Sequence, residues 1–483
     1  MKKTKRSWLN LALVLGCCGV LAVSCTTDYV TGKKTFSLVS ESQEVAMGRE
    51  ADPQIVAQYG LYDDKDLSEF INALGQSLAR ESHRPQLEYT FRVLDSEIIN
   101  AFALPGGYVY VTRGILAHFN SEDELAGVLG HEIGHVVARH SAEQMSRQQL
   151  AGLGLGLGSA VLGDLEQFAQ AAGFGVQLLL LRYSRGQESE SDRLGVEYST
   201  KLGYDAHRMA KFFQTLDRMS EKSGQSLPSF MSTHPDPGDR ENTVYALTDE
   251  WQKKVNYAPL NRNPNDYLRM IDGIVFGADP RQGYEADGMF YHPSLAFQFP
   301  VPDDWRLMNT PNAVFMVSPD EKAIIQMTLT EAATATDAGQ EFVKKNGVTV
   351  LSRRSNTLNG FPAHILVSEK TDEDGSIKIQ SYFIDRGGKI YVFHGYCSPV
   401  DFDANAGTFE LVMGGYKKVT DQGVLNVKPR RLRIREAPHS GSMSSVLTAL
   451  GAEQGKVGDL AILNGRRPND VVEKGALIKV VGD

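Results

Sequence analysis

Two histidines and a glutamate in the first half of the chain have the spacing of a metal-binding motif. His131, Glu132 and His135 belong to the run HEIGH, in a stretch whose apolar residues recur at helical spacing. Positions four apart share one face of a helix, so both histidines can hold one metal ion. Glu132 is displaced by one position, which suits a base acting on a water molecule at the metal rather than a ligand. Ser121 and Glu124 form a candidate capping box at the start of this helix.

A second predicted helix supplies acidic partners for the two histidines. Glu188 and Asp192 are four positions apart and share a face, whereas Glu190 lies about 200° around from Glu188 and should point elsewhere. Glu188 would complete a His, His, carboxylate set with an open fourth position, so we expect one Zn²⁺ per chain. Asp192 can then accept a hydrogen bond from a ligand histidine and fix its tautomer. The alternative is a solvated acidic helix face beside two unrelated histidines.

The segment from about Glu41 to Arg240 resembles the gluzincin metallopeptidases, which include the CAAX prenyl endopeptidases and the bacterial membrane heat-shock proteases. It is most similar to their soluble periplasmic relatives. Four motifs carry the resemblance in order: NAFALPGG with YVYVT at 100–112, His131 to His135, Glu188 to Asp192, and STHP at 232–235 with Arg240. Ser191 stands where the family usually has alanine. The resemblance implies a zinc endopeptidase in which Glu188 is the third ligand.

The expected reaction assigns roles to three residues. Glu132 takes a proton from the attacking water and passes it to the leaving amine. The developing oxyanion needs a further donor, for which His234 is the first candidate and Arg240 the second. His234 could instead occupy the open metal position and keep the enzyme latent, or it could be a turn histidine without a role.

The residues Asn100, Ala101, Phe102 and Ala103 could form an exposed strand edge above the metal. Runs at 91–94 and 108–112 alternate like strands, with Pro105-Gly106-Gly107 turning between them. Such an edge would pair with the backbone of an extended peptide, which favours unfolded polypeptide as substrate. The alternative is a structural hairpin.

Five of the other histidines show no partner at ligand spacing. They are His118, His140, His207, His292 and His394. Since His140 is nine residues from His131, it would lie about 180° away on a continuous helix and should not reach the same metal.

The first 24 residues have the anatomy of a secretory leader. Positive residues precede an apolar run that is too short to span a bilayer comfortably. The run ends before Cys25, which resembles the lipid-accepting cysteine of bacterial lipoproteins, with Cys17 as the weaker candidate. Thr26 then favours the outer membrane, which predicts a periplasmic, lipid-anchored protein of a Gram-negative bacterium. After removal of the leader only Cys397 would remain as a free thiol, and we expect it to be a small buried hydrophobe.

The net charge of -9 argues against sequence-independent binding to nucleic acid. Glycine alternates with leucine from 152 to 158, and a second apolar stretch runs from 174 to 181. These stretches predict two closely packed helices that form a flap near the active site. A membrane-dipping hairpin is the alternative.

The second half of the chain is strand-rich. Linker-like stretches lie at 261–266 and 277–280. We expect strands at 295–299, 323–329, 376–384 and 389–395, a helix at 336–345 and a hairpin turn at 385–388. Residues 292–305 are similar to PsbP-like domains. This segment carries no catalytic constellation, so binding or scaffolding is its expected role.

The tail predicts a strand with a basic face, two short helices and a closing strand. Arg431, Arg433 and Arg435 alternate with apolar residues, helices are expected at 442–450 and 457–463, and a strand at 476–480. This order resembles a divergent LysM module, a family that binds glycans such as peptidoglycan. Residues 438–443 depart from the usual Gly-Asp-Thr turn, so a packing domain is the alternative. No repeat at 34-residue spacing supports a helical repeat array.

The predicted architecture is multidomain. A leader at 1–24 precedes a mainly α-helical (α+β) zincin-type protease domain at 25–262. An α+β domain with an antiparallel sheet follows at 263–420, and a small βααβ module at 425–483. The predicted function is zinc-dependent hydrolysis of unfolded or misassembled envelope proteins in protein quality control. A periplasmic adaptor or chaperone with a latent metal site and a murein-associated hydrolase are the alternatives.

Overall fold

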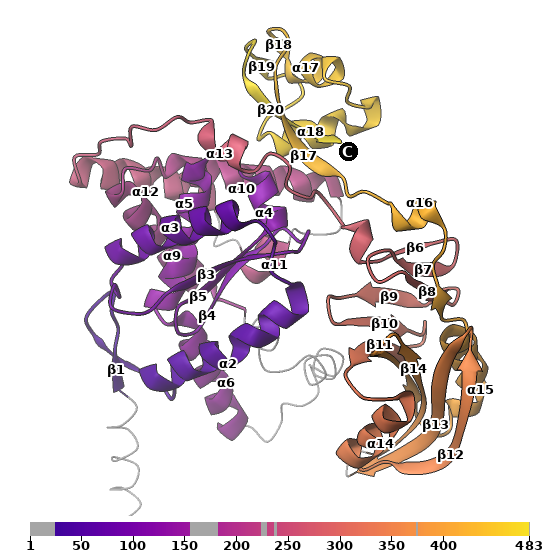
Figure 1. The fold of residues 1–483 in the computed structure, drawn as a ribbon. Helices are drawn as coiled ribbons and strands as arrows, with labels where there is room; N and C mark the ends of the chain where they lie inside the picture. The colour runs from indigo at the N-terminus through magenta and orange to yellow at the C-terminus, as the bar shows by residue number, and fades with distance from the viewer. Residues whose placement is uncertain (1–24, 155–181, 224–228, 236–238, 373–374, 483) are drawn as a thin grey trace, which may run out of the picture. The chain divides into compact units, whose positions relative to one another are not determined.

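The computed structural model describes residues 25–154, 182–223, 229–235, 239–372 and 375–482. The chain forms two compact units (Figure 1). The first comprises Met1–Gly277 together with Arg430–Gly482, and the second comprises Ala278–Pro429. Within the described ranges, no helix is both long and apolar enough to cross a membrane. The predicted leader and most of the glycine-rich segment lie outside the described residues.

A three-stranded mixed sheet lies at the centre of the first unit. Strand β3 (Thr90–Leu94) runs parallel to the central β5 (Tyr108–Thr112), and β4 (Ala101–Leu104) pairs antiparallel with the other side of β5. The predicted hairpin between 91–94 and 108–112 is therefore wrong. The Pro105–Gly107 turn joins β4 to β5, and β4 is an edge strand, as expected for 100–103.

Side chains alternate between the two faces of this sheet. Ala101, Ala103 and Val109 belong to the main core, whereas Phe102 and Tyr110 belong to a second cluster with α2. Figure 1 shows α3 and α5 on one side of the sheet and α2 on the other. The N-terminal hairpin and the helices of this part of the unit are β1 (Cys25–Thr27), β2 (Lys34–Phe36), α2 (Glu41–Tyr59), α3 (Lys65–Glu81), α4 (Arg113–His118), α5 (Glu122–Val137), α6 (His140–Gly154), α9 (Arg185–Lys201), α10 (His207–Ser223), α11 (Ser229–Thr233), α12 (Arg240–Lys254) and α13 (Asp266–Met270).

Helices α5 and α9, the two helices predicted to carry the metal ligands, pack at very short range through glycine. A Cβ atom on Gly195 of α9 would lie 2.8 Å from the backbone nitrogen of His131. A Cβ on Gly130 of α5 would lie 3.0 Å from the Cα of Gly195. Any larger side chain at these positions would separate the helices, so the glycines allow the two ligand-bearing faces to meet.

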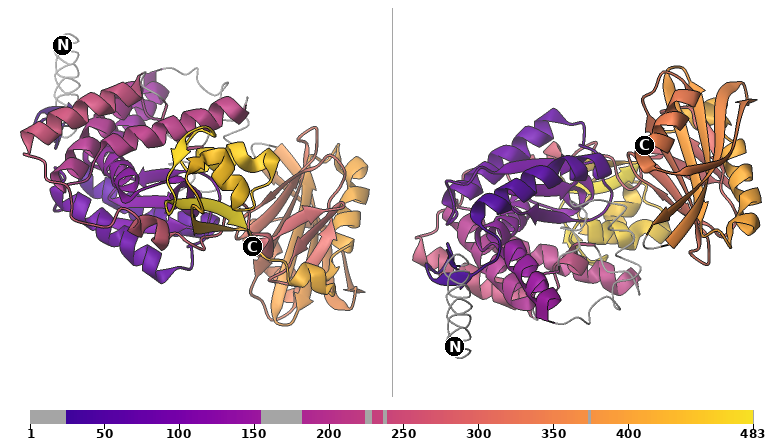
Figure 2. Two further views of the ribbon diagram at one scale, coloured as in Figure 1. Left: turned by 90° about the horizontal axis from the view of Figure 1, so that it is seen from above. Right: turned by 90° about the horizontal axis from the view of Figure 1, so that it is seen from below.

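The C-terminal module has the predicted strand–helix–helix–strand order and belongs to the first compact unit. Its outer strands pair antiparallel, and a core of its own lies between them and the two helices. In Figures 1 and 2 the module is drawn in yellow. Its elements are β17 (Arg431–Glu436), β18 (Gly441–Ser442), α17 (Met443–Ala449), α18 (Val457–Leu463), β19 (Val471–Val472) and β20 (Leu477–Gly482).

Lys479 of β20 joins the module to the helices before the metal motif. The side chain of Lys479 is fully buried, and its Nζ donates to the carbonyl oxygens of Ala117, His118 and Phe119 at 3.0 to 3.3 Å. Burial lowers the pKa of Lys479 to about 7, although the charge of Glu124 acts in the opposite direction. The ammonium group satisfies carbonyls at the end of α4 that have no partner within that helix.

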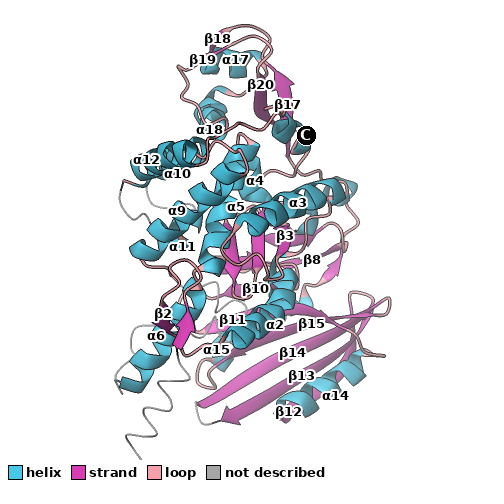
Figure 3. Ribbon diagram, turned by 90° about the vertical axis from the view of Figure 1, so that its left-hand side faces the viewer, coloured by secondary structure: helices cyan, strands magenta, loops and turns pink. Residues whose placement is uncertain are grey.

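The second unit contains a seven-stranded antiparallel sheet in the order β12-β13-β14-β15-β11-β10-β9. Helix α14 covers one face through Ala338, with Leu366 and Val392. Helix α15 and a four-stranded sheet cover the other face, where Cys397 is buried as predicted (Figure 3). The expected helix at 336–345 and the hairpin at 385–388 are confirmed. The elements are β6 (Tyr284–Ala286), β7 (Met289–His292), β8 (Phe297–Pro300), β9 (Arg306–Asn309), β10 (Ala313–Val317), β11 (Ala323–Thr330), α14 (Ala335–Asn346), β12 (Thr349–Leu358), β13 (Phe361–Asp372), β14 (Gly375–Arg386), β15 (Lys389–Cys397), α15 (Phe402–Gly414), β16 (Lys417–Lys418) and α16 (Gln422–Leu425).

Candidate metal centre

Four buried side chains of the first unit place one donor atom each around a common point. They are His131, His135, Glu188 and His234, and their donor atoms all lie within 4.8 Å of one another. The two histidines of α5 approach through their Nε2 atoms at 3.0 Å. Glu188 of α9 lies 3.5 Å from each of these atoms. The structure therefore brings together the three predicted ligands and adds His234.

The spacing of these atoms fits a four-coordinate zinc ion. Ligand bonds of about 2.0–2.1 Å in a tetrahedron place neighbouring ligand atoms about 3.3 Å apart. His234 Nδ1 lies 3.3 Å from His131 Nε2 and 3.2 Å from the Oε1 of Glu188. The Oε2 of Glu188 is buried and has no hydrogen-bond partner within the described part of the chain. A cation at the common point would satisfy these converging lone pairs.

Asp192 and Arg240 fix the orientation of His131 from the side of its ring that faces away from the other donor atoms. Asp192 Oδ1 lies 2.9 Å from His131 Nδ1, which is the contact expected from the helical spacing. A hydrogen bond donated from Nδ1 leaves the Nε2 lone pair directed at the other ligands. Arg240 donates to both carboxylate oxygens of Asp192 at 2.7 Å. Burial alone would raise the pKa of Asp192, but the charge of Arg240 and the hydrogen bond from His131 lower it to about 2.

His140 and Tyr183 contact His135, and the sequence interpretation missed both. His140 Nδ1 lies 2.9 Å from His135 Nδ1, and the ring of Tyr183 stacks on His135 at a centroid distance of 3.9 Å. The prediction that His140 lies on the far side of a continuous helix is wrong. Helix α5 ends at Val137, and Arg139 adopts a φ of 58°, which turns the chain back towards the site. His140 is not among the four clustered donors, as predicted.

Glu132 is buried beside the four donors without a hydrogen bond. Both of its carboxylate oxygens lack a partner within the described residues, and Oε1 lies 3.5 Å from His234 Nε2. Burial raises the pKa of Glu132, while the charges of His234 and His131 act in the opposite direction. A buried carboxylate without a partner is a strong proton acceptor, so its position suits general-base chemistry.

His234 follows the short helix α11. Its backbone N–H donates to the carbonyl oxygen of Phe230 at 2.8 Å, and its ring stacks on the Phe230 ring at 4.5 Å. Burial alone would lower the pKa of His234, but the carboxylates of Glu188 and Glu132 raise it. The side chain is thus held among the donors by packing as well as by charge.

The predicted substrate strand lies close to the metal ligands. Ala103 and Leu104 of β4 lie beside His135, and the space between them is too small to hold a water molecule. Asn100 precedes the strand, and its side-chain oxygen accepts a hydrogen bond from Thr233 at 3.4 Å. All four side chains of β4 are buried, so an incoming peptide would contact this strand through backbone groups.

The other histidines for which no metal role was predicted lie elsewhere in the structure. His118 contacts the carbonyl oxygen of Gly114, and His207 contacts Asp205. His394 contacts Ser381, and His292 lies in the second unit near Phe297. None of them belongs to the described cluster of donors.

The segment that carries the metal site is similar to known proteins. Residues 67–247 match peptidase family M48. The mitochondrial metalloendopeptidase OMA1 of Schizosaccharomyces pombe is 31% identical over 263 residues, which cover 51% of this chain and 73% of that protein. The chain belongs to peptidase family M48. The resemblance to the CAAX prenyl endopeptidases in particular stays a prediction.

Two bacterial members of family M48 are also similar. The beta-barrel assembly-enhancing protease of Yersinia pestis is 34% identical over 218 residues, which cover 43% of this chain and 44% of that protein. The corresponding protein of Escherichia coli is 30% identical over 250 residues, which cover 50% and 51%. This M48 chain thus spans about half the length of these relatives.

A solved structure is similar to another part of the chain. The cyanobacterial PsbP protein of Synechocystis is 14% identical and covers 27% of this chain and 91% of its own, with a TM-score of 0.24. This likeness is too slight to assign the fold of the second unit. The PsbP-like character of residues 292–305 therefore remains a prediction.

Proposed function

We propose that this chain is a zinc-dependent endopeptidase that hydrolyses unfolded or extended polypeptides of the bacterial envelope. The observation that carries the proposal is the convergence of the donor atoms of His131, His135, Glu188 and His234 beside the buried carboxylate of Glu132, which has no hydrogen bond within the described residues. A structural metal site needs no unpartnered acid next to its ligands. An adaptor whose site is only structural does not account for Glu132.

Different side chains of the site have different roles in peptide hydrolysis. A bound zinc ion would polarise the scissile carbonyl and lower the pKa of a water molecule. Glu132 accepts the proton of the attacking water and delivers it to the leaving nitrogen. Asp192 and Arg240 are positioning residues, since the guanidinium of Arg240 holds the carboxylate that orients His131. The edge of β4 binds the substrate backbone.

The envelope location rests on the lipoprotein-like leader. Cys25 would carry the lipid, and the chain from β1 onwards would then lie in the periplasm at the outer membrane. Binding of peptidoglycan by the LysM-like module is part of the same proposal. A shift of a labelled Cys25→Ala variant from the membrane to the soluble periplasmic fraction would support the anchor.

Metal removal tests the endopeptidase activity directly. The zinc-loaded chain is expected to cleave unfolded casein, to lose this activity in a zinc chelator, and to regain it when one equivalent of zinc is restored. The measurement is the release of fluorescent fragments at fixed protein concentration. A chain that binds one zinc per molecule but cleaves nothing in any arm would favour the adaptor or chaperone alternative.

His234 is the residue whose replacement separates latency from catalysis. Since its Nδ1 lies among the donor atoms, we propose that it fills the fourth metal position and keeps that position closed. His234→Ala is then expected to raise the turnover of a short peptide by about tenfold, because a replaced ligand exposes the position to substrate. The control is His207→Ala, on the surface of α10, which should leave turnover unchanged. A fall in kcat in the His234 variant would show a transition-state donor instead.

A further inference from the structure

A cavity leads away from the metal centre on the side of His234. This cavity has a volume of about 170 Å³, and its lining includes His234, Arg240, Asp217 and Glu241. Asp217 and Glu241 also line a second, larger cleft of about 880 Å³. The two spaces therefore share part of their lining and lie next to each other.

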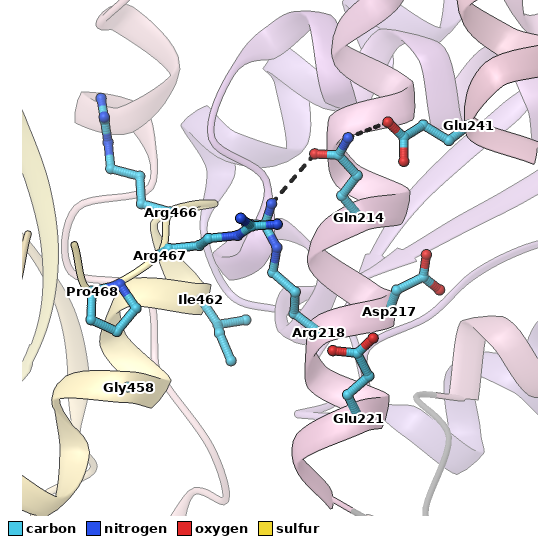
Figure 4. A pocket seen from close by; sticks show the side chains of 10 residues that line it. All are labelled: Gln214, Asp217, Arg218, Glu221, Glu241, Gly458, Ile462, Arg466, Arg467 and Pro468. Atoms are coloured by element: carbon cyan, nitrogen blue, oxygen red, sulfur yellow. Dashed lines mark hydrogen bonds between the residues drawn. The ribbon is translucent and has the colours of Figure 1, made fainter. Parts of the chain in front are cut away.

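The larger cleft lies between the protease helices and the C-terminal module, and we call it the module cleft. One wall is formed by α10 and α12, and the other by α18 and the loop after it. Figure 4 shows Asp217, Arg218 and Glu221 on α10, with Arg466 and Arg467 on the opposite side. The module thus contributes directly to a space that lies next to the cavity beside His234.

Three arginines of the module cleft have no carboxylate partner within the described part of the chain. Arg218 donates to the carbonyl oxygen of Gly465 at 3.3 Å and to the amide oxygen of Gln214 at 3.5 Å. Arg466 donates to the carbonyl oxygen of Val471 at 3.2 Å. The guanidinium of Arg467 is exposed and makes no side-chain hydrogen bond within the same described ranges. Guanidinium groups present planar pairs of donors that match a carboxylate, so Arg466 and Arg467 on the module wall can still bind anions.

The helix wall carries acidic side chains as well as Arg218. Glu221 and Glu241 lie on the helix side, and Glu241 accepts a hydrogen bond from Gln214. These carboxylates repel an anionic segment from the helices and direct it towards the module. The position of an acidic segment in the cleft is therefore set by Arg466 and Arg467 rather than by α10.

We propose that the module cleft holds a part of the substrate polypeptide distant from the scissile bond, and that Arg466 and Arg467 bind its carboxylates. The carboxylates are those of aspartate and glutamate side chains or of the substrate C-terminus. The position of the cleft next to the cavity beside His234 favours a polypeptide over a free glycan, because one extended chain can reach from the one space to the other. This inference rests on the proposed endopeptidase function.

Binding to an inactive chain tests the proposal without any need for catalysis. The probes are fluorescently labelled, unstructured peptides with a glutamate block at either end, each matched by a peptide with glutamine in place of glutamate. Fluorescence anisotropy is measured with the zinc-loaded Glu132→Gln chain at low salt. We expect one glutamate peptide to bind about fivefold more tightly than its glutamine match, because exposed charge pairs contribute modestly and are screened by salt.

The arginine variant assigns this preference to the module. In Arg466→Gln/Arg467→Gln the preference for glutamate is expected to disappear, while affinity for the glutamine peptide stays the same. The control is Arg435→Gln/Lys474→Gln, which removes two exposed cations of the same module that do not line the cleft. Far-ultraviolet circular dichroism and thermal melting check that both variants are folded.

Activity measurements separate this proposal from the endopeptidase function itself. In the catalytically competent chain, loss of Arg466 and Arg467 should raise KM for the glutamate peptide and leave kcat unchanged, because the contact is the same in the ground and transition states. If the native chain cleaves peptides but binds glutamate and glutamine peptides equally, the proposal is overturned and the endopeptidase function stands. Arginine-dependent binding of soluble muropeptides without any peptide preference would also overturn it, and would make the cleft a glycan site.

Discussion

Glu132→Gln is expected to lower kcat/KM for an unfolded polypeptide by about 10³-fold, within the range for loss of a general base. Glutamine has nearly the same shape and cannot accept the proton of the attacking water. Because neither oxygen of Glu132 has a hydrogen bond within the described residues, the change breaks no hydrogen bond there. The measurement is steady-state cleavage of casein or of a quenched fluorescent peptide by the zinc-loaded variant.

The zinc content of the variant distinguishes loss of the general base from loss of the metal site. The Glu132 variant should bind one zinc per chain with unchanged affinity, because the ligand atoms belong to other residues. Glu69→Gln is a suitable control, since Glu69 lies on α3 and pairs with Lys65 at the surface. Cleavage by the Glu132 variant at a rate close to that of the native chain would contradict the mechanism.

Asp192→Asn is expected to weaken zinc binding by about 10- to 100-fold, the usual effect of removing a carboxylate behind a ligand histidine. If the asparagine oxygen takes the place of Oδ1, its NH₂ group faces the Nε of Arg240, and the hydrogen bond from that atom at 2.7 Å is lost. If the oxygen takes the place of Oδ2, the contacts of Oδ1 with His131 and with the other donor of Arg240 are lost instead. Competition with a coloured zinc chelator measures the affinity.

The contribution of Asp192 to the stability of the folded chain depends on pH with a defined sign. The pKa of Asp192 is lowered to about 2 in the folded chain, below the ordinary value of 3.8. Its contribution to stability is therefore complete above pH 3.8 and is lost as the pH falls towards 2. Between pH 4 and 8 the effect of Asp192→Asn should be constant. An effect that disappears at pH 7 would contradict the assigned role, and Asp249→Asn on exposed α12 serves as the control.

The two helices that carry the metal ligands could be predicted because the spacing of their residues is a local property of the sequence. Helical spacing alone places His131 and His135 on one face, and the same rule separates Glu188 and Asp192 from Glu190. Local capping was predicted less well. Ser121 caps α5 by accepting the N–H of Glu124, but the Glu124 carboxylate accepts from Asn120 instead of completing the box.

The parts that could not be predicted depend on turns and on contacts between distant segments. The chain turns at Arg139, whose backbone is left-handed, and this turn brings His140 to His135 after the end of α5. An arginine at this position does not indicate such a turn. Strand β3 pairs parallel to β5, a pairing that local alternation does not distinguish from a hairpin. The module cleft forms only when residues near 466 meet those near 217, so no spacing in the sequence indicates it.

The buried ammonium of Lys479 also bears on the order of events during synthesis. Its acceptor at Ala117 lies 362 positions earlier in the chain, at the end of the helix that directly precedes the metal-binding α5. A ribosome-bound chain that has not reached β20 leaves these carbonyl groups without their partner, although every metal ligand is already present. Folding of the metal-binding unit therefore depends on a contact between its first part and β20, and we expect this unit to be complete only after β20 has been made.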